Sequence, residues 1–234
     1  MNTLDTRIKT YPVAVDLVIL TIKSGELSVL CVKRGSAPFK GSWALPGGFL
    51  REGEALADAA HRELKEETGL DNLSVGHLEQ LASYGNPDRD PRGTVVSVAY
   101  LAFVPDLPLP VAGGDAAQAR FVSVTPFLSD ESTLAFDHLI ILSDALTRTK
   151  AKFEYTSLAA CFCPAEFTLT DLRKIYETVW RNPLNPSNFQ RKVLSTPGFV
   201  KETGNKVKVG GRPAKTYTAG GNIQLHPPIL RGGL

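Results

Sequence analysis

The sequence has few cysteines and no long apolar run, and both scarcities narrow the class of protein that it encodes. Its three cysteines, Cys31, Cys161 and Cys163, are too few for a disulfide framework. The Cys-Phe-Cys pair has no second Cys or His pair at zinc spacing, so we expect reduced structural thiols. The longest apolar stretch, 12–22, is interrupted by Asp16 and is too short for a membrane span.

Several other classes are excluded by what is missing. The first ten residues lack the apolar core of a secretory signal, and there is no internal repeat or low-complexity tract. Hydrophobic residues make up 43% of the 234 residues and charged residues 21%, which disfavours disorder, collagen-like repeats and coiled coils. We therefore expect a globular cytoplasmic protein with no membrane partner, of one large domain or two small ones.

Charge is distributed unevenly along the chain. From residue 151 onward there are 12 Lys and Arg and 5 Asp and Glu, a net charge of +7, which leaves −5 for the preceding residues. This asymmetry suggests two domains, 1–150 and 151–234, of which the second has a polyanionic partner. On charge alone, a basic surface that only faces solvent is an equal alternative.

The first domain contains strand and helix patterns in alternation, which predicts an α/β or α+β fold. Two alternating apolar runs joined by Ser24-Gly25 predict a hairpin over 13–19 and 27–33. A helix over 54–68 is expected to end at Gly69, a good residue for a helix C-terminus. Further strands are predicted near 75–83, 94–104 and 119–124, and a second helix over 134–150.

The second domain has a different sequence pattern, of short helices followed by a ribbon. Thr170 can cap a helix over 171–180, and Ser187 can cap a second short helix. A β-ribbon with turns at Gly204-Asn205 and Gly210-Gly211 follows. Two helices joined by a tight turn and followed by a β-ribbon are the layout of a winged helix-turn-helix, so we expect an α+β protein with this domain at its C-terminus.

Three carboxylates gather on the first predicted helix. Glu63, Glu66 and Glu67 stand at i, i+3 and i+4 near its C-terminus, where like-charge repulsion and the helix dipole both oppose them. A bound cation would offset that cost, and carboxylates without His or Cys suit Mg²⁺ or Mn²⁺. The alternative is a solvated face of glutamates, which three Glu alone would favour.

The surroundings of these glutamates resemble the signature of the Nudix hydrolase superfamily. Residues 48–70 read G-x5-E-x7-R-E-L-x-E-E-x-G-L and match it at all nine defined positions. The resemblance implies an α/β/α sandwich whose loop-helix-loop binds divalent metal and hydrolyses nucleoside diphosphates linked to another moiety. It implies metal ligation by Glu63, Glu66, Glu67 and a backbone oxygen of Gly47 or Gly48, with Arg62 and Glu54 as a bracing ion pair.

Other residues are candidates for holding the rest of a ligand. Arg89 and Arg92 in the loop NPDRDPRG can pair with phosphates, although arginines in a polar loop are as often solvated. Phe136, Asp137 and His138 form an aromatic-acid-imidazole cluster at the start of a helix. Their alternative role is packing and capping.

The second short helix carries polar and apolar residues on opposite sides. Phe189 and Val193 can anchor it to a core. The other side can place Asn and Arg on base edges and Lys and Ser on phosphates of double-stranded DNA. The alternative is a basic protein-interaction module. The DNA-binding candidates on the helix and ribbon are Asn188, Arg191, Lys192, Ser195, Lys201, Lys206, Lys208, Arg212 and Lys215.

Taken together, the two halves resemble the Nudix-related transcriptional regulators of NAD metabolism (NrtR). The shared segments are RDPRG at 89–93, AFDHL at 135–139, FTLTDL at 167–172 and GRPAKTY at 211–217. The resemblance implies a homodimer that binds a DNA operator, represses NAD-biosynthesis genes and responds to ADP-ribose or a related NAD metabolite. Many members carry a degraded Nudix box, whereas this box is intact. The competing hypothesis is therefore a Mg²⁺-dependent ADP-ribose pyrophosphatase with a C-terminal appendage that does not bind DNA.

Overall fold

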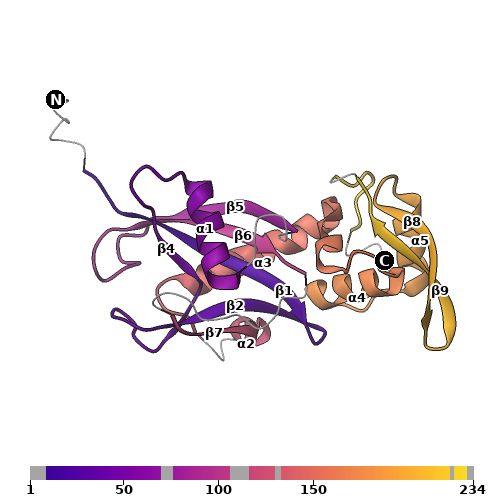
Figure 1. Cartoon of the computed structure of the whole chain (residues 1–234), viewed down its shortest axis with the longest axis horizontal. Coiled ribbons are helices and arrows are strands. Elements are labelled where there is room, and N and C mark those ends of the chain that lie inside the picture. The colour runs from indigo at the N-terminus through magenta and orange to yellow at the C-terminus, as the bar shows by residue number, and fades with distance from the viewer. Residues whose placement is uncertain (1–8, 70–75, 106–115, 130–132, 222–223, 231–234) are drawn as a thin grey trace.

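Two packed parts joined by one long helix make up the molecule, which is elongated along that helix (Figure 1). The computed structural model describes residues 9–69, 76–105, 116–129, 133–221 and 224–230. The first part is built on a seven-stranded mixed sheet, and the second consists of helices and a two-stranded ribbon. No helix within the described ranges is long and apolar enough to cross a membrane.

The sheet has strand order β3-β2-β1-β6-β5, with β4 paired to β1 and β7 to β2. Strands β1 and β6 are parallel, and the other pairs are antiparallel. The predicted hairpin is confirmed, because Ser24 and Gly25 turn β1 into β2 with positive φ angles of 53° and 81°. The strands are β1 (Val13–Lys23), β2 (Glu26–Arg34), β3 (Trp43–Ala44), β4 (Gly47–Phe49), β5 (His77–Tyr84), β6 (Val96–Phe103) and β7 (Ala116–Ser123).

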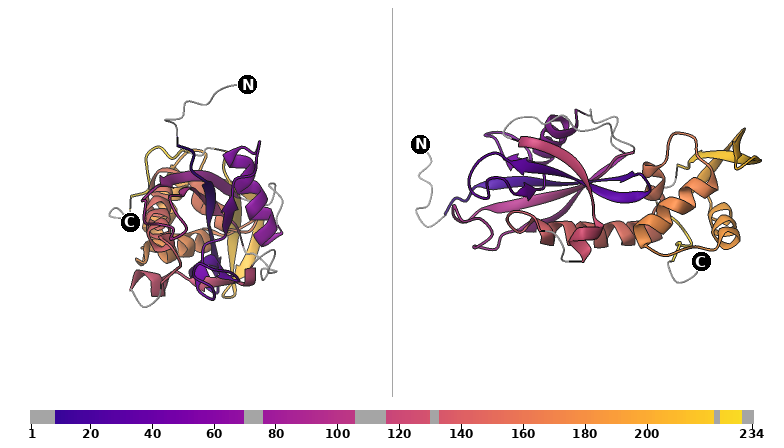
Figure 2. Two further views of the ribbon diagram at one scale, coloured as in Figure 1. Left: turned by 90° about the vertical axis from the view of Figure 1, so that its left-hand side faces the viewer. Right: turned by 90° about the horizontal axis from the view of Figure 1, so that it is seen from below.

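One helix covers each face of the sheet (Figure 2). Because side chains alternate along a strand, Val15, Leu17 and Ile19 of β1 pack under α1 (Leu56–Thr68). Val18 and Leu20 point to the other face, which α3 (His138–Tyr155) covers. The small helix α2 (Thr125–Leu128) follows β7. The expected α/β/α sandwich is therefore present.

Helix α1 has the predicted end and a later start. Gly69 adopts φ 71° after its last residue, and its N–H donates to the carbonyl of Lys65. The helix begins at Leu56 rather than residue 54, because Ala55 is extended and Glu54 binds Arg51 and Arg62 instead. Ala59 and Ala60 are fully buried against the sheet, where small side chains allow a close approach.

Helix α3 begins later and runs further than the predicted 134–150. Phe136 adopts φ 56°, which no helix interior accommodates, so the helix begins at His138. It continues through residue 150 to Tyr155 and leads into a 3₁₀ segment, η2 (Ser157–Phe162). The predicted domain boundary thus falls within a continuous helix. The three cysteines are free, and burial raises the pKa of Cys31 to about 12 and that of Cys161 to about 11.

The C-terminal part contains α4 (Leu169–Trp180), α5 (Pro186–Ser195) and a ribbon of β8 (Val200–Val209) and β9 (Arg212–Ala219). Tyr217 of β9 pairs with Phe167 just before α4, which ties the ribbon to the helices. Phe153 of α3 and Phe189 of α5 belong to the same buried cluster as residues of the sheet. The two parts therefore share one continuous hydrophobic core.

Three local predictions in this part were wrong. Thr168 caps α4, not Thr170, because Thr168 and Asp171 form a reciprocal capping box. Asn185 caps α5, not Ser187, because Pro186 occupies the first helical position and Asn185 accepts from Asn188 N–H. Gly204-Asn205 lies within β8 as a register irregularity rather than at a turn.

The capping box gives a direct test of this correction. Replacing Thr168 with alanine should lower the free energy of unfolding by about 1 kcal/mol, because the N–H of Asp171 loses its acceptor. Replacing Thr170, inside the helix, should change it by less than about 0.5 kcal/mol. Urea denaturation followed by circular dichroism measures both, and a larger effect at Thr170 would contradict the assignment.

Candidate ligand pocket and nucleic-acid interface

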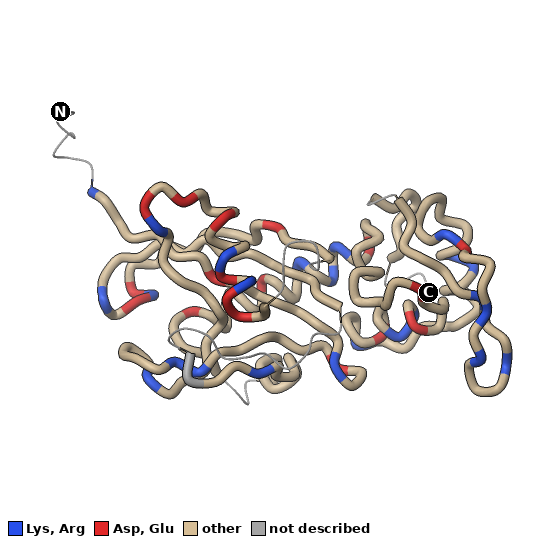
Figure 3. The backbone as a smooth tube through the Cα atoms, viewed as in Figure 1, with Lys and Arg blue, Asp and Glu red and all other residues tan. Residues whose placement is uncertain are grey.

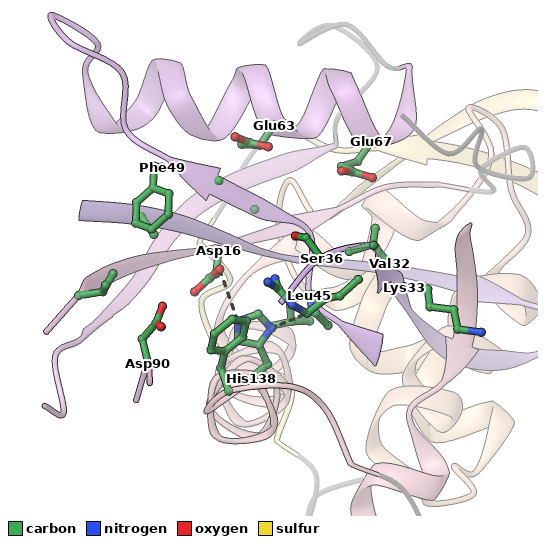
Figure 4. Close-up of a pocket in the computed structure, with 18 of the residues that line it drawn as sticks. Asp16, Val32, Lys33, Ser36, Leu45, Phe49, Glu63, Glu67, Asp90 and His138 are labelled. Atoms are coloured by element: carbon green, nitrogen blue, oxygen red, sulfur yellow. Dashed lines mark hydrogen bonds and ion pairs between the residues drawn. The ribbon is translucent and has the colours of Figure 1, made fainter. Parts of the chain in front are cut away.

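A cleft of about 800 Å³ lies between α1 and the first turn of α3 (Figure 4). Its walls come from β1, the loop through β4, helix α1 and the loop after β5. The structure thus brings together the Nudix residues and four of the five candidates for the rest of the ligand, while Asp137 lines an adjoining cavity. The lining includes Gly48, Glu63, Glu66, Glu67, Arg89, Arg92, Phe136 and His138.

The Nudix ion pair is present as the resemblance implies. Arg62 Nε and Nη2 donate to the two carboxylate oxygens of Glu54 at 2.7 and 3.0 Å, which is bidentate geometry. This hydrogen bonding, with a further one from the Arg51 N–H, lowers the pKa of Glu54 to about 2. Arg62 also donates to Glu63. The pair holds the loop that contains Glu54 against helix α1.

Gly48 is required by the position of Glu63. A Cβ atom built at Gly48 would lie 2.1 Å from Glu63 Oε1, and one at Gly47 would lie 2.3 Å from the Val15 carbonyl. The Glu63 carboxylate therefore rests directly on the glycine backbone. Gly47, Gly48 and Glu63 all line the cleft.

The other two glutamates are placed differently from each other. Glu66 is half exposed and pairs with Arg51 at 3.3 Å, whereas Glu67 faces the cleft with Glu63 (Figure 4). Burial, and then the nearby Glu63 and Glu66, raise the pKa of Glu67 to about 7. One buried oxygen of Glu67 has no hydrogen-bond partner among the described residues. A carboxylate oxygen of this kind is suited to act as a ligand of a bound cation.

The convergence of all three carboxylates is not complete. Within the described part of the chain, no three His, Cys, Asp or Glu side chains lie close enough together to hold a metal ion jointly. All three glutamates line the cleft, but Glu66 is paired with Arg51 at 3.3 Å and would have to leave it to join the other two on a cation. The set of three ligands, with Gly48, stays a prediction.

Arg89 is buried and already paired. Its guanidinium donates to both carboxylate oxygens of Asp137, at 2.9 and 2.7 Å, and to Asp16 at 3.2 Å. Asp137 stands at the N-cap position of α3, but its carboxylate accepts hydrogen bonds from Arg89 and does not cap the helix. A phosphate would meet Arg89 only in competition with these two aspartates.

Arg92 is more available than Arg89. It donates to Asp90, yet its side chain is 45% exposed and lies over the rings of Phe49 and Phe136, at 5.2 and 5.8 Å from their centroids. Arg34 covers Phe136 at 4.7 Å. Phe136 therefore lies beside two guanidinium groups in a cleft that is apolar in part, an arrangement suited to an anionic, ring-containing ligand.

Sequence reasoning missed Asp16 as a site residue. Its carboxylate accepts hydrogen bonds from Ser97, at 2.5 Å, and Arg89, and Asp16 Oδ1 lies 3.6 Å from Nε2 of His138. The signal was present, because Asp16 alternates with apolar residues on the α3-facing side of β1. A buried charge at such a position requires a partner from the covering helix.

The face of α5 predicted to meet DNA is exposed. Asn188, Arg191 and Ser195 face solvent and Lys192 is half-buried, whereas Phe189 and Val193 are buried. Arg191 donates to Asn188 at 3.3 Å, so the two polar heads lie side by side. The amphipathic prediction for this helix is confirmed.

Lys and Arg residues lie along the ribbon (Figure 3), and the strand pairing places them on two faces. Lys206 stands opposite Lys215, and Lys208 opposite Pro213, so these lysines share one face. Arg212 pairs with Val209 beside the Gly210-Gly211 turn and belongs to the other face. Like charges directly opposite one another are unfavourable, and Glu202 offsets this only at Lys215. A bound phosphate group would offset the remaining repulsion between these lysines.

An acidic Nudix loop and helix beside a ligand-sized cleft, followed by a winged helix with an exposed basic face, define a two-domain class of protein. The family described as NUDIX domain matches residues 10–141, and the NrtR DNA-binding winged helix domain matches residues 160–219. The chain therefore belongs to the NrtR family. Nudix hydrolases generally use divalent metal ions.

Two of three similar proteins match most of the chain and support this assignment, and the third matches a shorter part of it. The ADPR responsive transcriptional repressor NtrR of Acinetobacter baylyi is 37% identical over 212 residues, covering 88% of this chain and 82% of that protein. The ADP-ribose pyrophosphatase of Methanocaldococcus jannaschii is 41% identical over 140 residues, covering 59% and 75%. The crystal structure of Shewanella oneidensis NrtR complexed with a 27mer DNA has a TM-score of 0.75 and 31% identity, covering 88% of this chain and 93% of that chain.

Proposed function

We propose that this chain is a DNA-binding repressor of NAD metabolism genes whose Nudix domain binds ADP-ribose or a related NAD metabolite. The observation that carries the proposal is the presence, in one chain, of an arginine- and aromatic-lined cleft beside the Nudix acids and a winged helix with an exposed basic face. The names of the Acinetobacter and Shewanella relatives support it. We further propose a cytoplasmic homodimer, because two-fold symmetric operators pair with dimeric helix-turn-helix proteins.

The cleft suits the parts of ADP-ribose. Phosphates carry the negative charge that Arg92 and Arg34 would meet, and the ring of Phe136 offers a stacking surface. Glu63, Glu66 and Glu67, with a carbonyl of the glycine loop, would hold Mg²⁺ or Mn²⁺ beside the pyrophosphate. When bound, such a cation neutralises phosphate charge.

The DNA surface suits a major groove flanked by phosphates. Helix α5 would place Asn188 and Arg191 on base edges, with Lys192 on the backbone. Lys206, Lys208 and Lys215 on the ribbon would neutralise phosphates, and Arg212 at the glycine turn would enter a minor groove. Several such contacts displace counterions, so binding should weaken steeply as salt rises.

Fluorescence anisotropy tests the proposal. The purified protein is titrated against a duplex from upstream of its own gene, with and without ADP-ribose, and without divalent metal so that turnover cannot interfere. We expect sequence-specific binding that ADP-ribose changes by about fivefold or more. Binding equal to that of a scrambled duplex at every salt concentration would refute the repressor function.

A second candidate function is hydrolysis of ADP-ribose by the same cleft. The observation that favours it is the intact Nudix box, whose ion pair and Gly48–Glu63 contact are in place. Metal-assisted attack of water on the pyrophosphate would give AMP and ribose 5-phosphate. If the second candidate alone is correct, the C-terminal part is an appendage that does not bind DNA.

A further inference from the structure

The first turn of α3 is hydrogen-bonded to both walls of the cleft. On one side, the N–H of Leu45, just before the glycine loop, donates to Nδ1 of His138 at 2.9 Å (Figure 4). On the other side, Arg89 donates two hydrogen bonds to Asp137, which directly precedes the helix. A displacement of either wall by a ligand therefore acts on the same turn.

The orientation of His138 is determined by its surroundings. The side chain is almost wholly buried, and Nδ1 accepts the Leu45 hydrogen bond, so the ring proton lies on Nε2 and faces Asp16. Asp16 is itself held by Ser97 and Arg89. The imidazole thus joins β1, the glycine loop and α3 in one arrangement of donors and acceptors.

Helix α3 is restrained along its length by the edge strand β5. Asp144 accepts from the Tyr84 hydroxyl at 2.9 Å, Arg148 donates to the Leu81 carbonyl at 3.3 Å, and Lys152 pairs with Glu79. These contacts recur at intervals of four residues, so they lie on one side of the helix. Helix α3 is thus packed on one face, tied along another, and spans about 27 Å as one continuous element.

The far end of α3 contacts α4, and α4 in turn contacts α5, the helix that carries the predicted DNA-binding face. The Tyr176 hydroxyl of α4 donates to the Phe153 carbonyl at 3.1 Å. The Tyr176 ring packs on Phe153 and on Phe189 of α5, with centroids 5.2 and 5.3 Å apart. Trp180 Nε1 donates to the Lys150 carbonyl at 3.4 Å. A movement of α3 therefore reaches α5 through side chains in direct contact.

We propose that His138 is a positioning residue that transmits occupancy of the Nudix cleft to α5, through Leu45 at one end and α3, Phe153 and Tyr176 at the other. The inference rests on the proposed function, since it concerns the effect of ADP-ribose on DNA binding. The inference holds whether ADP-ribose strengthens or weakens DNA binding. Coupling requires that the ligand bind two arrangements of this connection with different affinity.

The test measures the ratio of DNA dissociation constants at saturating and zero ADP-ribose. The DNA probe is a duplex selected by the full-length protein from a random pool, and saturation is established separately for each variant. We expect a wild-type ratio that departs from one by about fivefold or more. His138→Gln leaves the Leu45 N–H without its acceptor and should bring the ratio within about twofold of one.

A second variant guards against misfolding of the first. Tyr176→Phe keeps the ring and its packing and removes only the hydrogen bond to Phe153, so it too should bring the ratio closer to one. Tyr155→Phe, at an exposed tyrosine at the end of α3, is the matched control and should keep the wild-type ratio. A wild-type ratio in both His138→Gln and Tyr176→Phe overturns the inference alone. A ratio of one in the wild-type protein overturns effector control and the inference with it.

Discussion

Replacing Arg191 or Arg212 with alanine is expected to weaken sequence-specific DNA binding sharply while ADP-ribose binding persists. Arg191 lies exposed on α5 beside Asn188, and Arg212 lies at the glycine turn of the ribbon, so each would lose a distinct contact. A base-directed arginine contributes about 1–3 kcal/mol, a loss of roughly 5- to 150-fold in affinity at each position. Anisotropy on the selected duplex measures the affinity, and calorimetry measures ADP-ribose binding.

Gln190→Ala is the matched control for this prediction. Gln190 is exposed on α5 but lies away from the Asn188–Arg191 side, so its loss should leave DNA affinity within about twofold. The two arginines should also differ in character, because Arg191→Ala should relax base preference while Arg212→Ala should weaken selection at a flanking minor groove. Retained sequence-specific binding in both arginine variants would show that the DNA surface lies elsewhere.

Replacing Glu67 with glutamine is expected to lower the rate of divalent-metal-dependent hydrolysis of ADP-ribose by about 100-fold or more. The substitution preserves the shape of the side chain and removes its negative charge. It also replaces one of the two carboxylate oxygens with an NH₂ group, which donates hydrogen bonds and cannot bind a cation. Because one buried oxygen of Glu67 has no partner among the residues described, a cation is the group that this change would exclude. Release of AMP, followed by chromatography with Mg²⁺ or Mn²⁺ present, measures the turnover.

Glu52→Gln provides the same chemical change at an exposed position outside the helix, and it should hydrolyse like the wild-type protein. Undiminished turnover by Glu67→Gln would refute the assigned role of Glu67. Absence of turnover in the wild-type protein with either metal would refute the hydrolase candidate and leave the repressor proposal untouched.

Local features of this protein could be predicted from its sequence, and contacts between distant segments could not. Helix α1 ends at Gly69 because a glycine adopts the left-handed conformation easily, and that signal is read within a few residues. The ion pair of Arg62 and Glu54 was predicted from the resemblance to the Nudix signature, and both residues lie within that one motif. Both helix caps of the winged helix were misplaced because neighbouring residues had equal capping chemistry, and only Asp171 and Pro186 decide between them.

The environment of His138 lay beyond such reasoning. Its hydrogen bond to Leu45 joins residues 93 positions apart, and the packing of α3 on the sheet creates it. Arg89 illustrates the same limit, because a loop arginine became a buried ion pair only when two aspartates from other elements met it. Sequence patterns and the family resemblance predicted several residues of the cleft, while the fold decides which of them remain available to a ligand.

The continuous core has a consequence for how variants of this protein should be interpreted in cells. Because residues of the sheet, α3 and both winged-helix helices lie in one buried cluster, a destabilising change in any of them lowers the folded population of the whole chain. A sheet variant would then derepress target genes simply through reduced abundance. Genetic screens for loss of repression should therefore recover many substitutions far from both sites, and protein level must be measured before such a substitution is assigned to signalling.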